Sequence, residues 1–447
     1  MDSVHSKAEL YGDFYRELVK KYNGEKFETL LDYLRNVIAG LGADQSFYTI
    51  DFADVVLKVQ LWRRNMPNIQ TFYAVKTNSD PLLLRLLVML GFSFDCASQG
   101  EIELVMQAGA SPNNIIFAHV IKTPGALRYS ASVGVDLMTF DCEEELVKIQ
   151  TYFPAARLLL RIAPVNVKCS FDLSDKFGCD AEDAEHILKQ AKNLKLDVIG
   201  VSFHVGGLCK DPDSYAATIR SAAEVFQVAH KMGFKFRILD IGGGFSGKKG
   251  TEDLFDEMTQ TIWSVVRENF DEKEIEIIAE PGTFFVGSAA TLTTAICGKK
   301  KTHKKTGATE DGIERIYYIN DSIYGSFFHG VEEYGMRPKP MLEESVLTQR
   351  PVYKSRLWGQ SCCGEDLLLK VCLLADMEDG EFIMWENMGA YSRVLCSSFC
   401  AIPIPATKHI FINNDRLSAE WLNNFEEVTN FLSEQCSLVD AEKHFKS

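Results

Sequence analysis

Between residues 45 and 285, short apolar runs alternate eight times with stretches of helical periodicity. The runs are rich in β-branched and aromatic residues, as in "IQTFYAVK", "ARLLLRIA" and "VIGVSFHV". Parallel strands need a crossover connection between them, and that connection is usually a helix. Eight strand–helix units of this total length therefore predict a closed parallel (β/α)8 barrel in the α/β class, with an open doubly wound sheet as the alternative.

The rhythm changes after residue 285, where strand-like runs follow one another without long helices between them. This pattern predicts a mostly antiparallel second domain, and 447 residues are enough for two domains. The strand candidates are "ATLTTAICGKK", "ERIYYIN", "PVYKSRLWG", "LLLKVCLLA" and "GEFIMWENMG". We expect an N-terminal segment (1–44) that packs with the β-domain, a barrel (45–283), and a C-terminal β-domain with a helical tail (284–447).

Composition argues against a nucleic-acid, membrane or secreted protein. A formal net charge of −15 disfavours binding to nucleic acid. No apolar stretch is long enough to span a bilayer, and the N-terminal "MDSVHSKAELYGDFYREL" has no signal-peptide core. The 12 cysteines are scattered and include no CxxC pair. Free thiols in the cytoplasm are therefore expected, and no metal site is predicted.

Five side chains that can do chemistry fall at or near the C-terminal ends of the predicted barrel strands, where such barrels gather their active sites. They are Lys76, Asp95, Arg161, His204 and Glu280. Taken singly, several have an ordinary explanation: a strand-end lysine reaches water, an aspartate caps a helix, and a lone histidine belongs to a core. Because all five converge on one mouth, separate explanations become strained, and a common site is predicted.

The chemistry of this set is that of a pyridoxal site. A lysine amine forms a Schiff base with an aldehyde, a histidine ring stacks on a flat heteroaromatic, and a carboxylate keeps a pyridine nitrogen protonated. The run Gly242-Gly243-Gly244 offers backbone amides that cradle a phosphate without side-chain obstruction. Together these are the requirements of pyridoxal 5'-phosphate, which is the predicted cofactor.

The motifs around these residues closely resemble those of the ornithine decarboxylase family, the eukaryotic fold-type III pyridoxal-phosphate decarboxylases. The matching motifs run in order from about residue 10 to 405: "FYAVKTN", "FDCAS", "GVSFHVG", "LDIGGGFSG", "AEPGTFFV", "YYINDSIYGSF", "WGQSCCGEDLL" and "NMGAYS". The resemblance implies an alanine racemase-like fold of barrel plus β-domain. It also implies a homodimer whose active sites lie at the interface.

Within the barrel, the resemblance makes Lys76 the Schiff-base lysine, with Asp95 and Arg161 supporting it. His204 would stack on the cofactor ring, and Glu280 would pair with the pyridinium nitrogen.

The remaining roles that the resemblance implies concern the phosphate and the proton transfer. The amides of Gly243 and Gly244 and the side chain of Tyr391 would hold the phosphate. Cys362, from the partner subunit, would be the acid near Cα. The "KFG" sequence (176–178) matches the mobile loop that the family carries over its site.

The chain departs from the family pattern at two phosphate contacts. Gly207 stands where the family usually has a serine, and Thr283 stands where it has an arginine. Both changes predict weaker cofactor binding.

The substrate end also departs from the pattern. The aspartate that receives the distal amine of ornithine is replaced by Cys363, and a second aspartate aligns approximately with Glu333 in a shorter segment. Phe399 matches the aromatic residue that borders the substrate pocket, and Tyr324 is assigned to the substrate site as well.

These features leave three functions open. The first is a decarboxylase that prefers an apolar amino acid such as leucine, and the second is ornithine decarboxylase itself. The third is a non-catalytic protein like the antizyme inhibitors, which bind the small regulatory protein antizyme. Segment 122–136 aligns with the family's antizyme-binding region, and Lys122 and Arg128 keep positive charge there. The retained catalytic set favours an enzyme.

Overall fold

The computed structural model describes residues 18, 21–42, 45–301, 312–328, 331, 336–413 and 425–439. The chain divides into two compact units. We call Lys58–Phe285 the barrel unit, and Met1–Leu57 with Val286–Ser447 the sheet unit.

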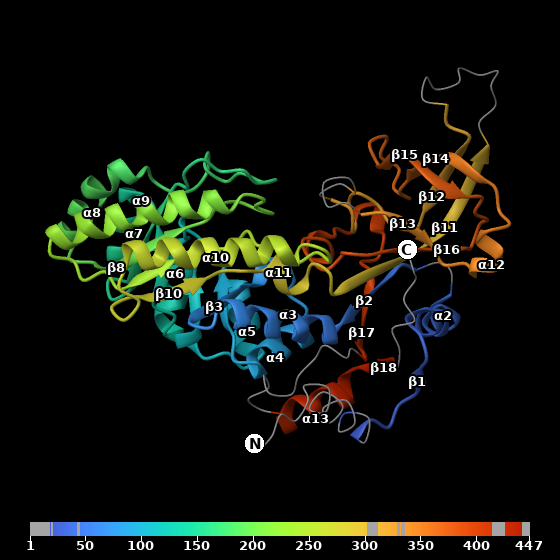
Figure 1. Ribbon diagram of the computed structural model, residues 1–447, viewed down its shortest axis with the longest axis horizontal. Helices are drawn as coiled ribbons and strands as arrows, with labels where there is room; N and C mark the ends of the chain where they lie inside the picture. The colour runs from blue at the N-terminus through green and yellow to red at the C-terminus, as the bar shows by residue number, and fades with distance from the viewer. Residues whose placement is uncertain are drawn as a thin grey trace, which may run out of the picture. The chain divides into compact units, whose positions relative to one another are not determined.

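The barrel unit contains the predicted closed barrel of eight parallel strands (Figure 1). Buried apolar side chains from these strands, among them Phe72, Ile116 and Leu159, form its interior. The open-sheet alternative is therefore wrong, because β10 pairs with both β9 and β3 and closes the ring. The strands are β3 (Ile69–Ala74), β4 (Ser93–Cys96), β5 (Ile115–Phe117), β6 (Leu137–Phe140), β7 (Arg157–Ile162), β8 (Asp197–Phe203), β9 (Ile238–Asp240) and β10 (Glu276–Ala279).

Helices lie outside the barrel strands, and their ends follow from local chemistry (Figure 1). Asp80 caps α4 by accepting from the backbone N–H groups of Leu82 and Leu83, and Pro81 follows at the first helical position. Gly134 ends α6 with a left-handed φ of 80°. The helices are α4 (Pro81–Met89), α5 (Gln99–Gln107), α6 (Pro124–Val133), α7 (Glu143–Tyr152), α8 (Ala184–Asn193), α9 (Pro212–Lys231) and α10 (Glu252–Asn269).

The sheet unit is built on a ten-stranded mixed sheet in which antiparallel pairings outnumber parallel ones among the described strands. Its strands are β1 (Lys26–Phe27), β2 (Phe47–Asp51), β11 (Ala290–Lys301), β12 (Arg315–Ile319), β13 (Pro338–Pro340), β14 (Val352–Trp358), β15 (Leu367–Ala375), β16 (Phe382–Trp385), β17 (Ala406–Ile412) and β18 (Ser437–Val439). Helix α2 (Leu30–Leu41) buries Tyr33, Leu34 and Val37 against Phe47 and Met384. The remaining helices of this unit are α12 (Glu344–Leu347) and α13 (Phe425–Gln435).

The boundary between the units lies later in the chain than the sequence predicted. The barrel was expected to begin at residue 45, but β2 pairs antiparallel with β11 and parallel with β17. It therefore belongs to the sheet, and the boundary falls inside α3 (Phe52–Asn65). On the C-terminal side, the boundary at Phe285 lies inside the short helix α11 (Thr283–Val286).

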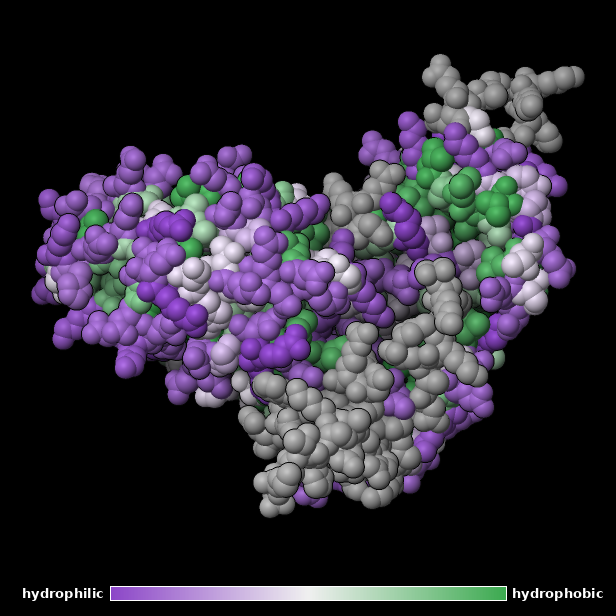
Figure 2. Space-filling model, in the orientation of Figure 1, coloured by the Kyte–Doolittle hydropathy of each residue, from purple (hydrophilic) through white to green (hydrophobic). Residues whose placement is uncertain are grey.

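The surface of the sheet unit exposes apolar side chains where strands β14 and β15 pair (Figure 2). Val352 is 60% exposed and Leu373 is 75% exposed. Strand β15 ends the strand order of the sheet, so one side of it has no neighbouring strand among the described residues. In the described part of the chain, no helix is both long enough and apolar enough to cross a membrane.

Candidate active site

Lys76 and Asp95 meet at the C-terminal ends of neighbouring barrel strands. Strand β3 ends at Ala74, and a single 3-10 turn (Val75–Thr77) carries Lys76 beyond it. The strand register places Ala74 beside Asp95, and the Lys76 Nζ atom forms an ion pair with the Asp95 carboxylate. The Asp95 side chain is 1% exposed, whereas that of Lys76 is 39% exposed. The amine therefore reaches the open mouth while its counter-ion stays buried.

His204 presents a neutral ring at the same end of the barrel. It follows strand β8 directly, and its Nδ1 atom accepts a hydrogen bond from the backbone N–H of Gly206 at 2.9 Å. Burial, aided by the positive charges of Arg161 and Lys76, lowers the pKa of His204 to about 3. Because Nδ1 is an acceptor and the ring is uncharged, its proton lies on Nε2.

The glycine turn after β9 packs closely against its neighbours. A Cβ atom on Gly243 would lie 2.6 Å from the backbone oxygen of Glu280 and 3.1 Å from Nε2 of His204. Gly244 has a φ of 111°, which side chains rarely adopt. The Tyr215 hydroxyl donates to the Gly243 carbonyl at 2.8 Å and fixes the turn. Only glycine fits here, because a Cβ atom would collide with the backbone of neighbouring segments.

Two buried carboxyl groups, Asp240 and Glu280, lie together beside this turn. Asp240 ends β9 next to Ile278, and the Glu280 backbone N–H donates to the Gly242 carbonyl at 2.8 Å. Each has one buried carboxyl oxygen with no hydrogen-bond partner in the described structure. Burial raises the pKa of Asp240 to about 6, and burial together with the Asp240 charge raises that of Glu280 well above its usual range. Reading the strand ends identified Glu280 but missed Asp240, although it is the last residue of "RILD" before the glycines.

Arg161 is a partly exposed cation whose charge acts on these acids. It lies on β7, and burial lowers its pKa, while Glu280, Asp240, Asp141 and Asp95 oppose that shift in this order. Its guanidinium lies 5.0 Å from the centre of the Phe177 ring.

Phe177 belongs to the "KFG" segment (176–178), which docks on the barrel through its backbone. The Gly178 N–H donates to Asp141 Oδ2 at 2.9 Å, and the Cys179 N–H donates to the Arg161 carbonyl at 3.1 Å. These bonds hold the segment against the strand that carries Arg161.

Three of the predicted substrate residues gather in the sheet unit. The Tyr324 hydroxyl donates to Cys363 Sγ at 3.0 Å, and the Tyr324 ring lies 4.5 Å from that of Phe399. This hydrogen bond is the largest cause of the raised pKa of Tyr324. The buried Asp366 joins the segments that carry Tyr324 and Cys363, because its carboxylate accepts from Ile323 and Ser361 at 2.9 Å each.

The other predicted residues of the sheet unit are Cys362, Tyr391 and Glu333. Cys362 is exposed, and Tyr391 is half-buried with a left-handed φ of 49°. Glu333 lies outside the described residues. Positions 207 and 283 carry no phosphate ligand of the family type: Gly207 packs toward Phe171, and Thr283 begins α11.

Lys122 is not on the surface, so its predicted contribution to a charged antizyme-binding surface is wrong. Its Nζ atom is completely buried, donates to the Thr139 carbonyl at 2.7 Å and pairs with Glu145 at 2.9 Å. The lysine thus joins the ends of two strands to α7. Arg128 is exposed on α6, where its guanidinium lies 5.1 Å from the centre of the Tyr152 ring.

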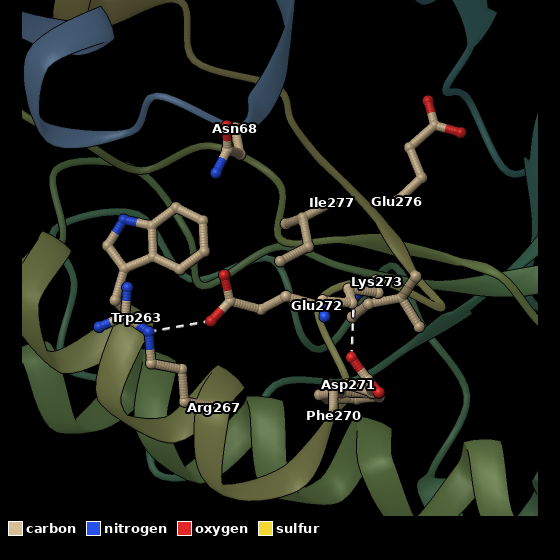
Figure 3. Close-up of a pocket in the computed structure, with 10 residues that line it drawn as sticks. Asn68, Trp263, Arg267, Phe270, Asp271, Glu272, Lys273, Glu276 and Ile277 are labelled. Atoms are coloured by element: carbon tan, nitrogen blue, oxygen red, sulfur yellow. Dashed lines mark hydrogen bonds and ion pairs between the residues drawn. The ribbon is translucent and has the colours of Figure 1, made fainter.

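A separate pocket of about 640 Å³ opens at the opposite end of the barrel strands (Figure 3). Asn68 precedes β3, and Glu276 and Ile277 begin β10. Its charged wall is occupied by an ion pair between Arg267 and Glu272 at 2.9 Å. Lys76 and Glu280 follow the other ends of these two strands, so this pocket is not the candidate site.

Comparison with known proteins first identifies the barrel unit. The family model for the pyridoxal binding domain of pyridoxal-dependent decarboxylases matches residues 52–287.

Curated relatives cover most of the chain. Antizyme inhibitor 2 of Xenopus laevis is 38% identical over 374 residues, which are 83% of this chain and 82% of that protein. Ornithine decarboxylase of Rattus norvegicus is also 38% identical, over 376 residues that cover 83% of this chain and 81% of that enzyme.

Solved structures share the fold. The arginine decarboxylase of Paramecium bursaria Chlorella virus superposes with a TM-score of 0.79 at 33% identity, covering 85% of this chain and all of that one (100%). Lysine decarboxylase from Selenomonas ruminantium superposes with a TM-score of 0.75 at 28% identity, covering 86% of this chain and 96% of that one.

Proposed function

The chain belongs to the pyridoxal-dependent decarboxylase family, with the pyridoxal-binding domain in its barrel unit, and on this premise we propose that it decarboxylates an apolar amino acid of about the size of leucine. The observation that carries the proposal is the cluster of Tyr324, Cys363 and Phe399. It offers a hydroxyl, a thiol and an aromatic ring where the family resemblance leads us to expect a carboxylate for a distal amine.

The barrel mouth fits pyridoxal phosphate in the chemistry of its groups. Lys76 is an amine that reaches the opening, and His204 offers a flat uncharged ring. One carboxyl oxygen of Glu280 is buried without a hydrogen-bond partner in the described structure, as a ring N–H would require. Gly243 and Gly244 carry no side chain that could stand between their backbone amides and a phosphate. We assign these residues to hold the cofactor, together with Asp95, Arg161 and Tyr391.

When bound, the cofactor supplies an electron sink for the electron pair left on Cα as carbon dioxide leaves. Glu280 would keep the ring nitrogen protonated, and Asp95 would hold Lys76 in place. Cys362, which we assign to the site of a partner subunit, would donate a proton to Cα of the product. Those assignments rest on the family resemblance and on the exposure of Cys362.

The preference for an apolar side chain follows from desolvation. A distal ammonium that enters beside Cys363 loses its water and meets a thiol, and leaving a buried charge unpaired costs several kcal/mol. A branched alkyl chain carries no such cost and gains about 25 cal/mol per Å² of apolar area buried beside Phe399. A discrimination of about a thousandfold can follow from one group left without its partner.

Carbon dioxide release from leucine, methionine, ornithine and lysine tests the proposal. We expect leucine or methionine to be turned over far faster than ornithine. In Cys363→Asp, the new carboxylate beside Tyr324 should raise kcat/KM for ornithine relative to leucine. Cys363→Asn should not, because asparagine has the shape of aspartate but no charge. Faster turnover of ornithine than of leucine by the unaltered protein would overturn the proposal. In that case Glu333→Ala would show whether Glu333 receives the distal amine.

A second candidate function is that of an antizyme inhibitor. The comparisons support it better than they support a leucine preference, because antizyme inhibitor 2 of Xenopus laevis is as similar to this chain as the rat ornithine decarboxylase. The exposed Arg128 on α6 supplies positive charge within the aligned segment. Calorimetry with purified antizyme tests this function: binding that Arg128→Glu weakens, by a preparation that releases no carbon dioxide from any amino acid, would replace the enzyme proposal.

A further inference from the structure

The Asp240 carboxyl is an acid in the barrel mouth that the functions assigned above do not use. It is 0% exposed, its Oδ1 atom accepts from the Gly242 N–H at 2.9 Å, and its Oδ2 atom has no hydrogen-bond partner in the described structure. Ser202 on β8 pairs in register with Asp240 on its other side, and its hydroxyl lowers the pKa of Asp240. Asp240 and Glu280 are two buried acids at adjacent strand ends, since Asp240 pairs in register with Ile278, two residues before Glu280.

Two buried carboxyls whose charges act on each other cannot both be ionised without a compensating charge. The charged groups that face the pair are Arg161 on β7, Asp95 on β4 and Lys76 after β3, and Asp141 after β6 also faces Arg161. Lys76 and Asp95 are ion-paired with each other. Arg161 therefore balances the charge of one carboxylate of the pair, and the other carboxyl keeps its proton.

We propose that Asp240 is a positioning residue that shares one proton with Glu280 and so keeps it ready for the ring nitrogen of pyridoxal phosphate. For a ring that enters with its nitrogen unprotonated, the O–H bond at the pair would break and an N–H bond would form. Both carboxylates are then ionised, opposite Arg161 and the pyridinium. The sum of these charges is zero before and after the transfer, so no charge has to enter the buried site from solvent. The inference rests on the proposed function in one respect, namely that pyridoxal phosphate binds.

The raised pKa values of both acids agree with a shared proton. Removal of Asp240 takes away the like charge that raises the pKa of Glu280, so Glu280 should lose its proton at lower pH. A residue with only a packing role would not cause this shift.

Infrared spectroscopy of the full-length protein, without and with pyridoxal phosphate, tests the inference. The cofactor-free protein should show a protonated-carboxyl band at neutral pH that Glu280→Gln abolishes. Asp240→Asn should move the loss of that band to lower pH by about one unit or more. Asp141→Asn, which removes another carboxylate that faces Arg161, should leave the band unchanged. Cofactor loading should abolish the band in the unaltered protein.

If Asp240→Asn does not fold, Ser202→Ala provides a second route. The Ser202 hydroxyl lowers the pKa of Asp240. Without it, the pair should keep the shared proton up to a higher pH. The inference is overturned if no band depends on Glu280, if neither variant moves it, or if it persists in the loaded protein. A protein that binds no pyridoxal phosphate would refute the proposed function and the transfer with it, while the titration of the free protein still decides whether the proton is shared.

Discussion

At the scale of single residues, the site combines groups that need burial with one that needs access. Asp95, Asp240 and Glu280 are buried, and each depends on a specific partner for its charge or proton. Lys76 is the exception, since more than a third of its side chain is exposed. This division suits a site in which a covalent partner enters from solvent and the proton chemistry is shielded from it.

Thr283→Arg should tighten the binding of pyridoxal phosphate. A charge-assisted contact to a phosphate is worth ~1.5–3 kcal/mol, which corresponds to roughly ten- to hundredfold in Kd. Titration of the visible absorption of the bound cofactor measures the change, and Thr283→Met, similar in size but uncharged, is the control. Equal affinities for the two variants would show that position 283 does not face the phosphate.

Gly207→Ser, at the other missing phosphate contact, should raise the affinity for pyridoxal phosphate less than Thr283→Arg does. A Cβ atom at position 207 would lie 3.1 Å from the Phe171 ring, so the ring would have to move before the hydroxyl could serve.

At the scale of elements, the barrel strands could be predicted from the sequence and several strands of the sheet could not. The barrel strands are apolar runs between helical stretches, which makes them visible as a pattern. Strands β1, β13 and β18 have only two or three residues each, and their pairing partners define them rather than their composition.

The burial of a charged residue also cannot be predicted from the sequence when its partner lies far along the chain. Glu145 is 23 residues from Lys122, and nothing in segment 122–136 shows that this lysine turns inward. Likewise, the glycines that follow Asp240 predicted a phosphate-binding turn, and the aspartate before them was assigned no role in the site.

Lys122→Met should destabilise the protein, because Glu145 would lose its buried ammonium partner and keep the backbone N–H of residue 122 and the partly exposed Lys148, at 2.5 Å. Breaking a buried pair in this way costs about 3–5 kcal/mol in the free energy of unfolding. Denaturant unfolding measures the loss, and Lys148→Met, which removes a less buried partner of the same carboxylate, should cost less. Equal losses in the two variants would contradict the structure around Lys122.

The pH dependence of that loss has a definite sign. Burial lowers the pKa of Lys122 from 10.5 to about 8, so between these pH values the unfolded chain binds a proton that the folded protein lacks. The stability contributed by Lys122 should therefore rise with pH from about 8 to 10.5. The difference in unfolding free energy between the unaltered protein and Lys122→Met should grow over this window, and a decrease would contradict the assigned burial.

At the scale of the whole molecule, the two units divide the proposed chemistry between them. The barrel unit carries the residues proposed to hold the cofactor except Tyr391, and the sheet unit carries Tyr391, Cys362 and the cluster of Tyr324, Cys363 and Phe399. In the homodimer that we propose, each site would take Cys362 from the partner subunit.

Mixing inactive subunits tests that assembly. Lys76→Ala and Cys362→Ala should each be inactive alone, but exchange between them should restore up to about a quarter of the activity of the unaltered protein. Random exchange makes half of the dimers mixed, and each mixed dimer has one intact site of two. Sedimentation measures dimer formation, and a mixture that exchanges subunits without regaining activity would contradict the shared site.

The most direct test of the central claim, that this chain is a working pyridoxal-phosphate enzyme, is borohydride reduction followed by peptide mass analysis. Incubation with pyridoxal phosphate and then borohydride should attach the cofactor irreversibly to Lys76, and Lys76→Arg, which keeps the charge opposite Asp95, should prevent it. Unaltered Lys76 after reduction at saturating cofactor would contradict the enzymatic account and leave the antizyme-inhibitor function in its place.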